Sequence, residues 1–435
     1  MDLEKVQRLV KKEFDGYEIF YLRETVKKLE SRRCELYNFE FSREEGIALR
    51  ALRGKKLAFS YTFGLEDEDL KRLIKKTEEI FPYLEEDEAY EFPEKRKKEE
   101  YPELQIYDKD GEDLDLEEKL ERLLKMERTI REDRRIVATR HLELLESTSF
   151  VEILNSNGLY VSGRKTLYTV SALAVAKDLE EVSWYDLIWS HRFEDLNFLE
   201  FGEMVREKAI SFLSSKKLRT GTYNGVLRPR VASALLSILS SSFLGENLYK
   251  EKTRLKGKIN EKCFSELLDI ENTGTFGPSS FPFDGEGFPS ISTKVVSGGY
   301  FQAFLYDSYY AKKLGTSSTG NCVRQSLPDM PRCGIRGLFI REDGGEFPEL
   351  SEGEIVLEDL MGTHTANPVT GEFSLGTLGF IKEKGRLVPF QGVMISGNVF
   401  EVFENVRAIG KDLKFYGNYG SPSLFVEGLR ISGVR

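Results

Sequence analysis

Hydrophobic positions recur at helical spacing in four segments of the first half of the chain. Leu3, Val6, Val10 and Phe14 predict an amphipathic first helix, and similar stripes predict helices over 65–81, from Asp115 onward and over 197–214. Alternating apolar and polar residues predict strands with one buried face. These strands are expected at 17–23, 34–41, 47–53, 56–62, 137–149, 150–156 and 159–176. Glycine-containing turns at 44–46 and 155–158 are expected to join neighbouring strands.

The second half of the chain shows a different pattern. A polar, turn-prone stretch at 216–221 marks the predicted boundary, and short apolar runs separated by glycines follow it. One helix is expected over 229–243, with Pro229 in its first turn and Val231, Leu235 and Leu239 on its buried stripe. The predicted fold class is α+β. A two-layer α/β domain with an antiparallel sheet is expected over 1–215, and a β-rich domain with mixed packing over 221–435.

Composition narrows the class of protein. The 435 residues are 40% hydrophobic, which is enough to build more than one core. Neither a signal peptide nor a run of 18 apolar residues is present, so we expect a cytoplasmic protein with no membrane partner. Four scattered cysteines predict reduced thiols. The net charge of −10 disfavours direct nucleic-acid binding. Abundant Lys, Arg and Glu with few Gln suggest a thermophilic source.

The segment 319–332 carries the strongest candidate chemistry. Arg324, Gln325, Ser326 and Arg332 place several hydrogen-bond donors within nine residues, and prolines stiffen the backbone between them. This pattern is typical of a loop that contacts a ligand. Arginines also pin loops through ion pairs, so a structural role is an equal alternative here.

Together with 229–234 and with Ser396-Gly397-Asn398, this loop resembles the C-terminal half of the TldD/PmbA family. That family has been described as modulators of DNA gyrase and as metallopeptidase subunits. Its TldD-type subunit carries His-Glu-x-x-x-His on a helix and a late Cys, which together hold a catalytic metal. In this chain, the matching positions hold residues that do not bind zinc. The two histidine positions are Pro229 and Ala234, the glutamate position is Arg230 and the cysteine position is Tyr419.

The resemblance therefore implies a PmbA-type (TldE-type) subunit with no catalytic residues, metal or cofactor of its own. Such a subunit is expected to pair with a TldD-type partner that carries zinc. A homodimer is the assembly considered for the chain alone, and the sequence does not decide whether it forms. The complex is expected to hydrolyse peptides or unfolded segments that bind in extended form. Candidates for the substrate groove are Arg324, Gln325, Ser326, Arg332, His364 and Asn398.

Three alternatives stay open from the sequence. The first is a structural or regulatory homodimer, the second is a self-sufficient hydrolase that uses His364 or Cys322, and the third is a nucleic-acid modulator. A lone histidine in a threonine-rich loop is more often a hydrogen-bonding residue than a catalyst. Asn398 follows Gly397 and is either the cap of a turn or a clamp on an extended ligand. Whether the isolated chain is an enzyme is left undecided.

Overall fold

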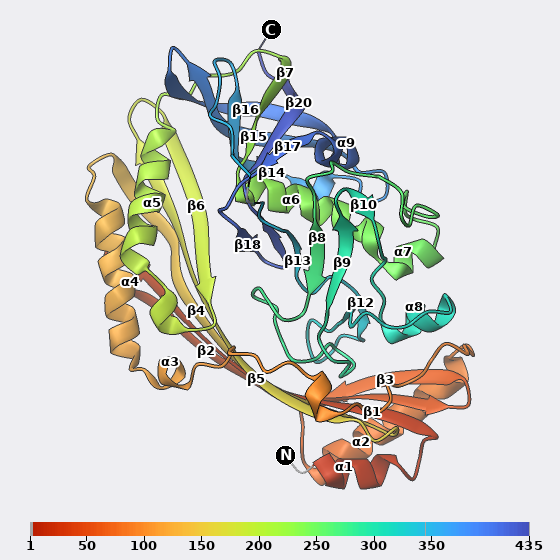
Figure 1. Cartoon of the computed structure of the whole chain (residues 1–435). Coiled ribbons are helices and arrows are strands. Elements are labelled where there is room, and N and C mark those ends of the chain that lie inside the picture. Colours follow the sequence, from red (N-terminus) through yellow and green to blue (C-terminus); the bar gives the residue numbers. More distant parts are fainter. Residues whose placement is uncertain (1–2, 344, 435) are drawn as a thin grey trace.

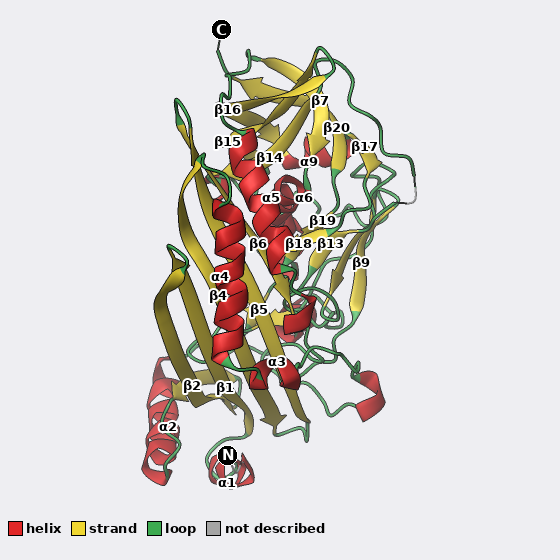
Figure 2. Ribbon diagram, turned by 90° about the vertical axis from the view of Figure 1, so that its left-hand side faces the viewer, coloured by secondary structure: helices red, strands yellow, loops and turns green. Residues whose placement is uncertain are grey.

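A computed structural model describes residues 3–343 and 345–434. A long curved sheet runs along one side of the molecule, and a β-rich part built from the second half of the chain lies against one face of it (Figure 1). Helices cover the opposite face (Figure 2). The mixture of an antiparallel sheet with covering helices and a β-rich second part confirms the predicted fold class.

The long sheet is antiparallel throughout, with strand order β3-β2-β1-β4-β5-β6. Its strands are β1 Gly16–Arg32, β2 Glu35–Arg53, β3 Lys56–Thr62, β4 Ile136–Asn155, β5 Tyr160–Lys177 and β6 Glu181–Ser190. Several of these strands are far longer than the mean strand of a globular protein, so the sheet has two ends that pack against different helices.

The helices of the first half pack at the two ends of this sheet. They are α1 Leu3–Val10, α2 Asp67–Ile80, α3 Lys109–Asp113, α4 Leu116–Arg131 and α5 Phe198–Ser211. Ile19 and Tyr21 of β1 pack against α1 and α2, whereas Val170 of β5 packs against α4 and α5. Alternate positions point to the other face of the sheet. There Phe20 and Leu22 join a cluster with residues of the β-rich part.

Several predicted strand boundaries were wrong. Segments 34–41 and 47–53 form the single strand β2, and 137–149 and 150–156 form the single strand β4. Strand β6 was not predicted. Gly46 lies within β2. A glycine is needed there because a Cβ would come within 2.4 Å of Leu327 Cδ2 and 2.5 Å of the Thr62 carbonyl oxygen. The glycine thus permits a close approach of two segments, and the turn expected at 44–46 is absent.

The described residues of the β-rich part form two six-stranded sheets. The first has order β10-β9-β8-β13-β19-β18, and the second has order β16-β15-β14-β7-β20-β17. An additional pairing of β16 with β20 closes five strands of the second sheet into a barrel. Both sheets contain one parallel pair, β13 with β19 and β7 with β14. This arrangement confirms the prediction of a β-rich part with mixed packing.

The strands of the β-rich part have the following bounds. The first sheet comprises β8 Ile270–Thr273, β9 Ser292–Ser297, β10 Tyr300–Phe301, β13 Leu338–Ile340, β18 Lys414–Tyr416 and β19 Tyr419–Ser421. The second comprises β7 Gly221–Leu227, β14 Ile355–Met361, β15 Glu372–Glu383, β16 Arg386–Asn398, β17 Val406–Ile409 and β20 Leu424–Ser432. A separate hairpin pairs β11 Cys322–Val323 with β12 Arg332–Cys333.

Helix α6 Pro229–Ser240 lies between the two sheets of the β-rich part and packs against β14, β18 and β19. Val231, Leu235 and Leu239 are fully buried, as the helical stripe predicts. Three shorter helices, α7 Gly245–Tyr249, α8 Ser308–Lys313 and α9 Val399–Glu404, complete this part. Across residues 3–343 and 345–434, no helix combines the length and the apolar character needed to cross a membrane.

Candidate functional site

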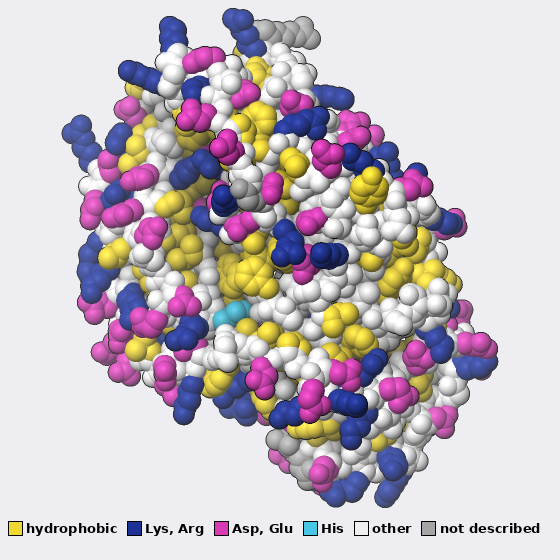
Figure 3. Space-filling model, in the orientation of Figure 1, with side chains coloured by type: hydrophobic (Ala, Val, Ile, Leu, Met, Phe, Trp, Pro, Cys, Tyr) yellow, Lys and Arg dark blue, Asp and Glu magenta, His cyan; other side chains and the backbone are white. Residues whose placement is uncertain are grey.

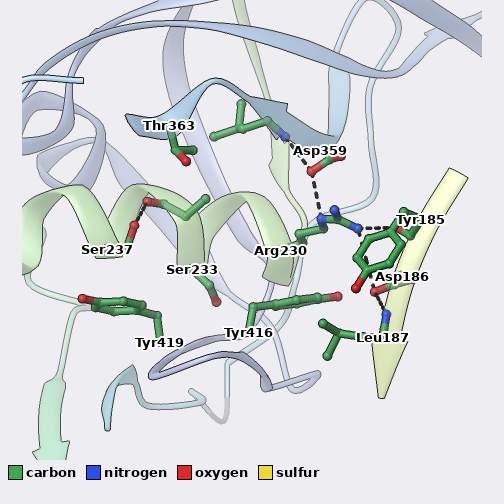
Figure 4. Close-up of a pocket in the computed structure, with 12 residues that line it drawn as sticks. Tyr185, Asp186, Leu187, Arg230, Ser233, Ser237, Asp359, Thr363, Tyr416 and Tyr419 are labelled. Carbon is green, nitrogen blue, oxygen red and sulfur yellow. Dashed lines mark hydrogen bonds and ion pairs between the residues drawn. The ribbon is translucent and has the colours of Figure 1, made fainter. Parts of the chain in front are cut away.

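A cavity of about 280 Å³ lies at the N-terminal half of α6. Arg230, Ser233, Ala234 and Ser237 line it from the helix, and Tyr185 and its neighbours line it from β6 (Figure 4). The remaining wall comes from residues near β14, β18 and β19, which are Asp359, Leu360, Thr363, Tyr416 and Tyr419. The cavity therefore gathers side chains from the long sheet and from both sheets of the β-rich part.

Arg230 lines this small cavity beside Asp359 and Tyr185 (Figure 4). Its Nε lies 2.8 Å from Asp359 Oδ1, and its Nη1 donates to the Tyr185 carbonyl and lies 3.9 Å from Asp186 Oδ1. A bulge in β14 between Leu357 and Asp359 interrupts its pairing with β15 at this point. Burial raises the pKa of both Asp186 and Asp359, and the Arg230 charge opposes that rise. The guanidinium is thus the cation that these two carboxylates share.

The four positions expected from the resemblance to match the family's metal ligands carry side chains that do not fit a zinc ion. Proline and alanine side chains have no donor atom, and a guanidinium has no lone pair to offer. Tyr419 Oη forms a 3.1 Å hydrogen bond with Ser240 Oγ, and burial raises the pKa of the phenol, which keeps it protonated. Throughout the described parts of the chain, no group of three or more His, Cys, Asp or Glu side chains is arranged to hold a metal.

A second, larger cavity of about 700 Å³ lies between the long sheet and the β-rich part. Its floor is one face of the sheet, formed by Phe20, Leu22, Glu24, Ser149, Val151 and Lys165. Its roof includes the β11–β12 hairpin, and Tyr419 lines both this cavity and the small one. On the face shown in Figure 3, hydrophobic side chains gather between the α4–α5 layer and the β-rich part, with charged residues around them.

All four donors of the predicted ligand-contacting loop line this larger cavity. Gln325 and Arg332 are exposed, and Ser326 Oγ donates to Asp329 Oδ2 at 2.7 Å. The Arg324 side chain is only 3% exposed. Its Nη2 donates to Glu18 Oε1 at 2.7 Å and to the Gly285 carbonyl at 3.3 Å. The loop therefore combines an ion pair that pins it to β1 with donors that face a cavity.

His364 and Asn398, the other two groove candidates, do not line either cavity. His364 is exposed in a short 3₁₀ turn, Thr363–Thr365. Asn398 caps α9 by accepting from the Phe400 N–H at 3.0 Å, and its amide donates to the Thr370 carbonyl at 2.8 Å. Asn398 is thus the cap that was one of its two alternatives, and His364 lies outside both cavities.

Cys322, the nucleophile of the hydrolase alternative, is buried and faces Cys333 across the hairpin. All four cysteines are free. Burial raises the pKa of the Cys322 thiol well above its usual value, and nearby carboxylates raise it further. The reactive thiolate is therefore disfavoured near neutral pH.

The sequence reasoning missed Lys165 and Asp186. Lys165 was within a predicted strand, and the alternation of β5 places it on the face opposite Val170, so the period-two pattern contained the signal. Asp186 lies on β6, a strand that was not predicted, and only the tertiary fold brings it to Arg230.

Comparison with known proteins gives consistent matches along the chain. Models of PmbA/TldA metallopeptidase domain 1, central domain and C-terminal domain match residues 17–81, 109–213 and 220–433. The metalloprotease PmbA of Escherichia coli O157:H7 is 25% identical over 96% of this chain and 92% of its own length.

Two solved structures share the fold over nearly the whole chain. One is a candidate modulator of a DNA gyrase from Thermotoga maritima, with a TM-score of 0.90, 25% identity and 99% coverage of both chains. The other is TldE from Thermococcus kodakarensis, with a TM-score of 0.88 and 22% identity, covering 99% of this chain and 100% of that one.

Proposed function

This chain belongs to the PmbA/TldA metallopeptidase family, and from that premise we propose that it is the subunit without a metal in a two-subunit peptidase. The catalytic zinc and the general base belong, in this proposal, to a TldD-type partner. The observation that carries the proposal is the Arg230 guanidinium, held by Asp359 and Tyr185 at the position where the metal-bearing subunit needs a glutamate. The positive charge of the Arg230 side chain repels a metal ion at this position, and a guanidinium has no lone pair with which to bind one.

The proposed substrate is an extended peptide or an unfolded segment. The larger cavity supports this part of the proposal because its lining contains both apolar side chains, such as Phe281 and Ile335, and polar and charged ones. Tyr419 connects its wall with the wall of the small cavity at α6. In the proposal, this chain supplies wall and positioning groups for a peptide that the partner cleaves.

The edge of β2 supports the proposed pairing with another subunit. Strand β3 pairs only with residues 47–53 of β2, so the described strands leave one edge of 35–46 without a neighbour. Apolar side chains are exposed along that stretch. They are Leu36 at 46%, Tyr37 at 62%, Phe39 at 42% and Phe41 at 59%. Exposed apolar rows on an unpaired edge are typical of surfaces that a partner covers.

We place the complex in the cytoplasm as part of the same proposal. Cys322 and Cys333 are directly opposite each other on paired strands and are thiols, which suits a reducing compartment.

The test is co-expression of this chain with the TldD-type protein of the same source, followed by purification and a peptidase assay. We expect the two chains to co-purify, and peptide cleavage to require the partner and to be abolished by a chelator. The matched control replaces the glutamate of the partner's His-Glu motif, which should abolish cleavage and leave co-purification intact. Cleavage by this chain alone, or failure of the two chains to associate, would overturn the proposal.

A further inference from the structure

Arg324 has hydrogen-bonding capacity that the protein does not use. Its side chain is 97% buried, yet its Nε and Nη1 have no acceptor among residues 3–343 and 345–434. Its Cζ lies 4.1 Å from the centroid of the Phe20 ring, so the flat guanidinium is held in a fixed orientation. A buried charged donor without an acceptor is costly, and such groups in native proteins call for a specific explanation.

The neighbouring carboxylates do not supply the missing acceptor. Glu18, the partner of Arg324 Nη2, also binds Arg50 through both of its oxygens. Glu286 lies 3.0 Å from Arg50 Nη1 and is likewise engaged. One carboxylate is therefore shared by two guanidinium groups, which leaves the Arg324 charge only partly compensated, and Arg324 is among the residues that line the larger cavity.

Lys165 adds a second cation to the floor of the same cavity. It lies in one row with Ser149 and Glu24 across β5, β4 and β1. No ion pair with a carboxylate within 4.0 Å is present among the described residues, and its Nζ donates to the Pro278 carbonyl at 3.4 Å. Burial, together with the Arg336 charge, lowers the pKa of Lys165 to about 8. An anionic ligand would favour the charged form of this lysine.

The rest of the lining indicates which anion fits. Glu24, Glu246 and Asp284 also face the cavity and would repel a dianion such as phosphate more strongly than a single carboxylate. The aromatic and aliphatic part of the wall requires that the anion be attached to an apolar body. This part comprises Phe20, Leu22, Val151, Leu244, Phe281, Phe283 and Ile335. A volume of about 700 Å³ is within the range of cavities that enclose a ligand of several residues.

We propose that this cavity binds the free C-terminal carboxylate of a peptide, with Arg324 as the hydrogen-bond donor and Lys165 as a second cationic group. The inference rests on the proposed function because it names the part of the peptide that this subunit holds. It assigns to this chain the recognition of one chain end, which would fix how far the remaining peptide extends toward the small cavity and the partner.

The experiment measures binding to the full-length chain alone by isothermal titration calorimetry. The probes are an apolar hexapeptide with a free C-terminal carboxylate, the same peptide with a C-terminal amide, and inorganic phosphate. We expect the free acid to bind at least about tenfold more tightly than the amide, and phosphate not to displace it. Equal affinity for acid and amide, or tighter binding of phosphate than of the peptide, would overturn the proposal.

Two variants and a control locate the site. Lys165→Met and Arg324→Gln should each weaken binding of the free acid severalfold and leave binding of the amide unchanged. Lys177→Met changes an exposed lysine of the same strand and should have no effect. Lys165→Met breaks no ion pair, so it tests the site even if Arg324→Gln fails to fold. Unchanged acid binding in Lys165→Met would contradict the assignment.

The outcome separates this inference from the proposed function. Acid-selective binding by the isolated chain, without peptidase activity of the complex, would support the site and overturn the proposed function alone. Peptidase activity of the complex without acid-selective binding would support the proposed function and overturn the carboxylate site alone.

Discussion

At the scale of single residues, Arg230 is the side chain on which the proposal of a subunit without a metal depends most. Its guanidinium ties the start of α6 to Asp359 of β14 and to the backbone of β6. The pKa values of Asp186 and Asp359 are raised because both carboxylates are largely removed from water. They stay close together because a cation lies between them.

Replacing Arg230 by Gln should therefore destabilise the protein. The buried carboxylate of Asp186 and the half-buried carboxylate of Asp359 would lose their common cation, and the expected loss is about 3 kcal/mol of unfolding free energy at pH 8. Urea unfolding followed by circular dichroism measures it. Arg228→Gln is the matched control, since its side chain is 45% exposed and lies 3.6 Å from Glu358; the expected change is at most about 0.5 kcal/mol. Equal effects of the two variants would show that the Arg230 contacts contribute no more than a surface pair.

Asp307 is a second residue with an unusual environment. It is 4% exposed, caps α8 by accepting from the Tyr310 N–H at 2.8 Å, and lies near Glu286 and Asp284. Burial, reinforced by Glu286, raises its pKa to about 7. An acid whose pKa is higher in the folded state than in the unfolded state stabilises the fold at low pH. This stabilisation is lost as the pH rises through the folded-state value.

Asp307→Asn should remove this pH dependence while keeping the helix cap, because an asparagine also accepts the capping hydrogen bond. Relative to wild type, the variant should gain about 1 to 2 kcal/mol of unfolding free energy between pH 5 and pH 8. Urea titrations at both pH values provide the measurement. Asp110→Asn, at an exposed position of α3, is the control and should show no such gain. A wild-type-to-variant difference that is the same at both pH values would refute the assigned pKa.

At the scale of elements, the β11–β12 hairpin joins the two halves of the molecule. Leu327 at its tip is fully buried against Phe20, Leu22 and Ala48 of the long sheet, and Gly46 makes room for it. The Arg324 to Glu18 ion pair lies beside this contact. The hairpin therefore fixes the roof of the larger cavity over its floor.

Leu327→Ala should loosen this connection. Deleting a fully buried leucine side chain typically costs about 3 kcal/mol, and the loss should appear in thermal unfolding and as faster proteolysis within 324–331. Met330→Ala, in the same loop but 42% exposed, is the control and should stay within about 0.5 kcal/mol of wild type. If both variants unfold alike, the tip of the hairpin does not anchor the loop.

The elements also show how far local sequence patterns reach. The stripe of Val231, Leu235 and Leu239 predicted α6, and alternation predicted most strands of the long sheet, because both depend on local periodicity. The continuity of β2 through Gly46 was missed because a glycine is required there by close contacts with Leu327 and Thr62, which are distant in sequence. Strand β6 was missed although Val182 and Trp184 alternate with polar residues over its first half.

At the scale of the whole molecule, two cavities share Tyr419 as part of their walls. The donor-rich loop was recognisable in the sequence as a candidate binding segment because its residues are consecutive. Lys165 and Asp186 were not, because each meets its neighbours only when the long sheet closes against the β-rich part. The ion pair of Arg324 with Glu18 spans 306 positions of the chain and has no local signature.

We propose above all that this chain binds no catalytic metal at α6. The most direct test loads the purified chain with zinc, removes unbound metal by desalting, and measures the metal content by mass spectrometry, with the TldD-type partner as positive control. We predict stoichiometric zinc in the partner and none retained by this chain, because Pro229, Arg230, Ala234 and Tyr419 offer no suitable ligands. Stoichiometric zinc held by this chain alone, with peptide cleavage that depends on it, would contradict the account.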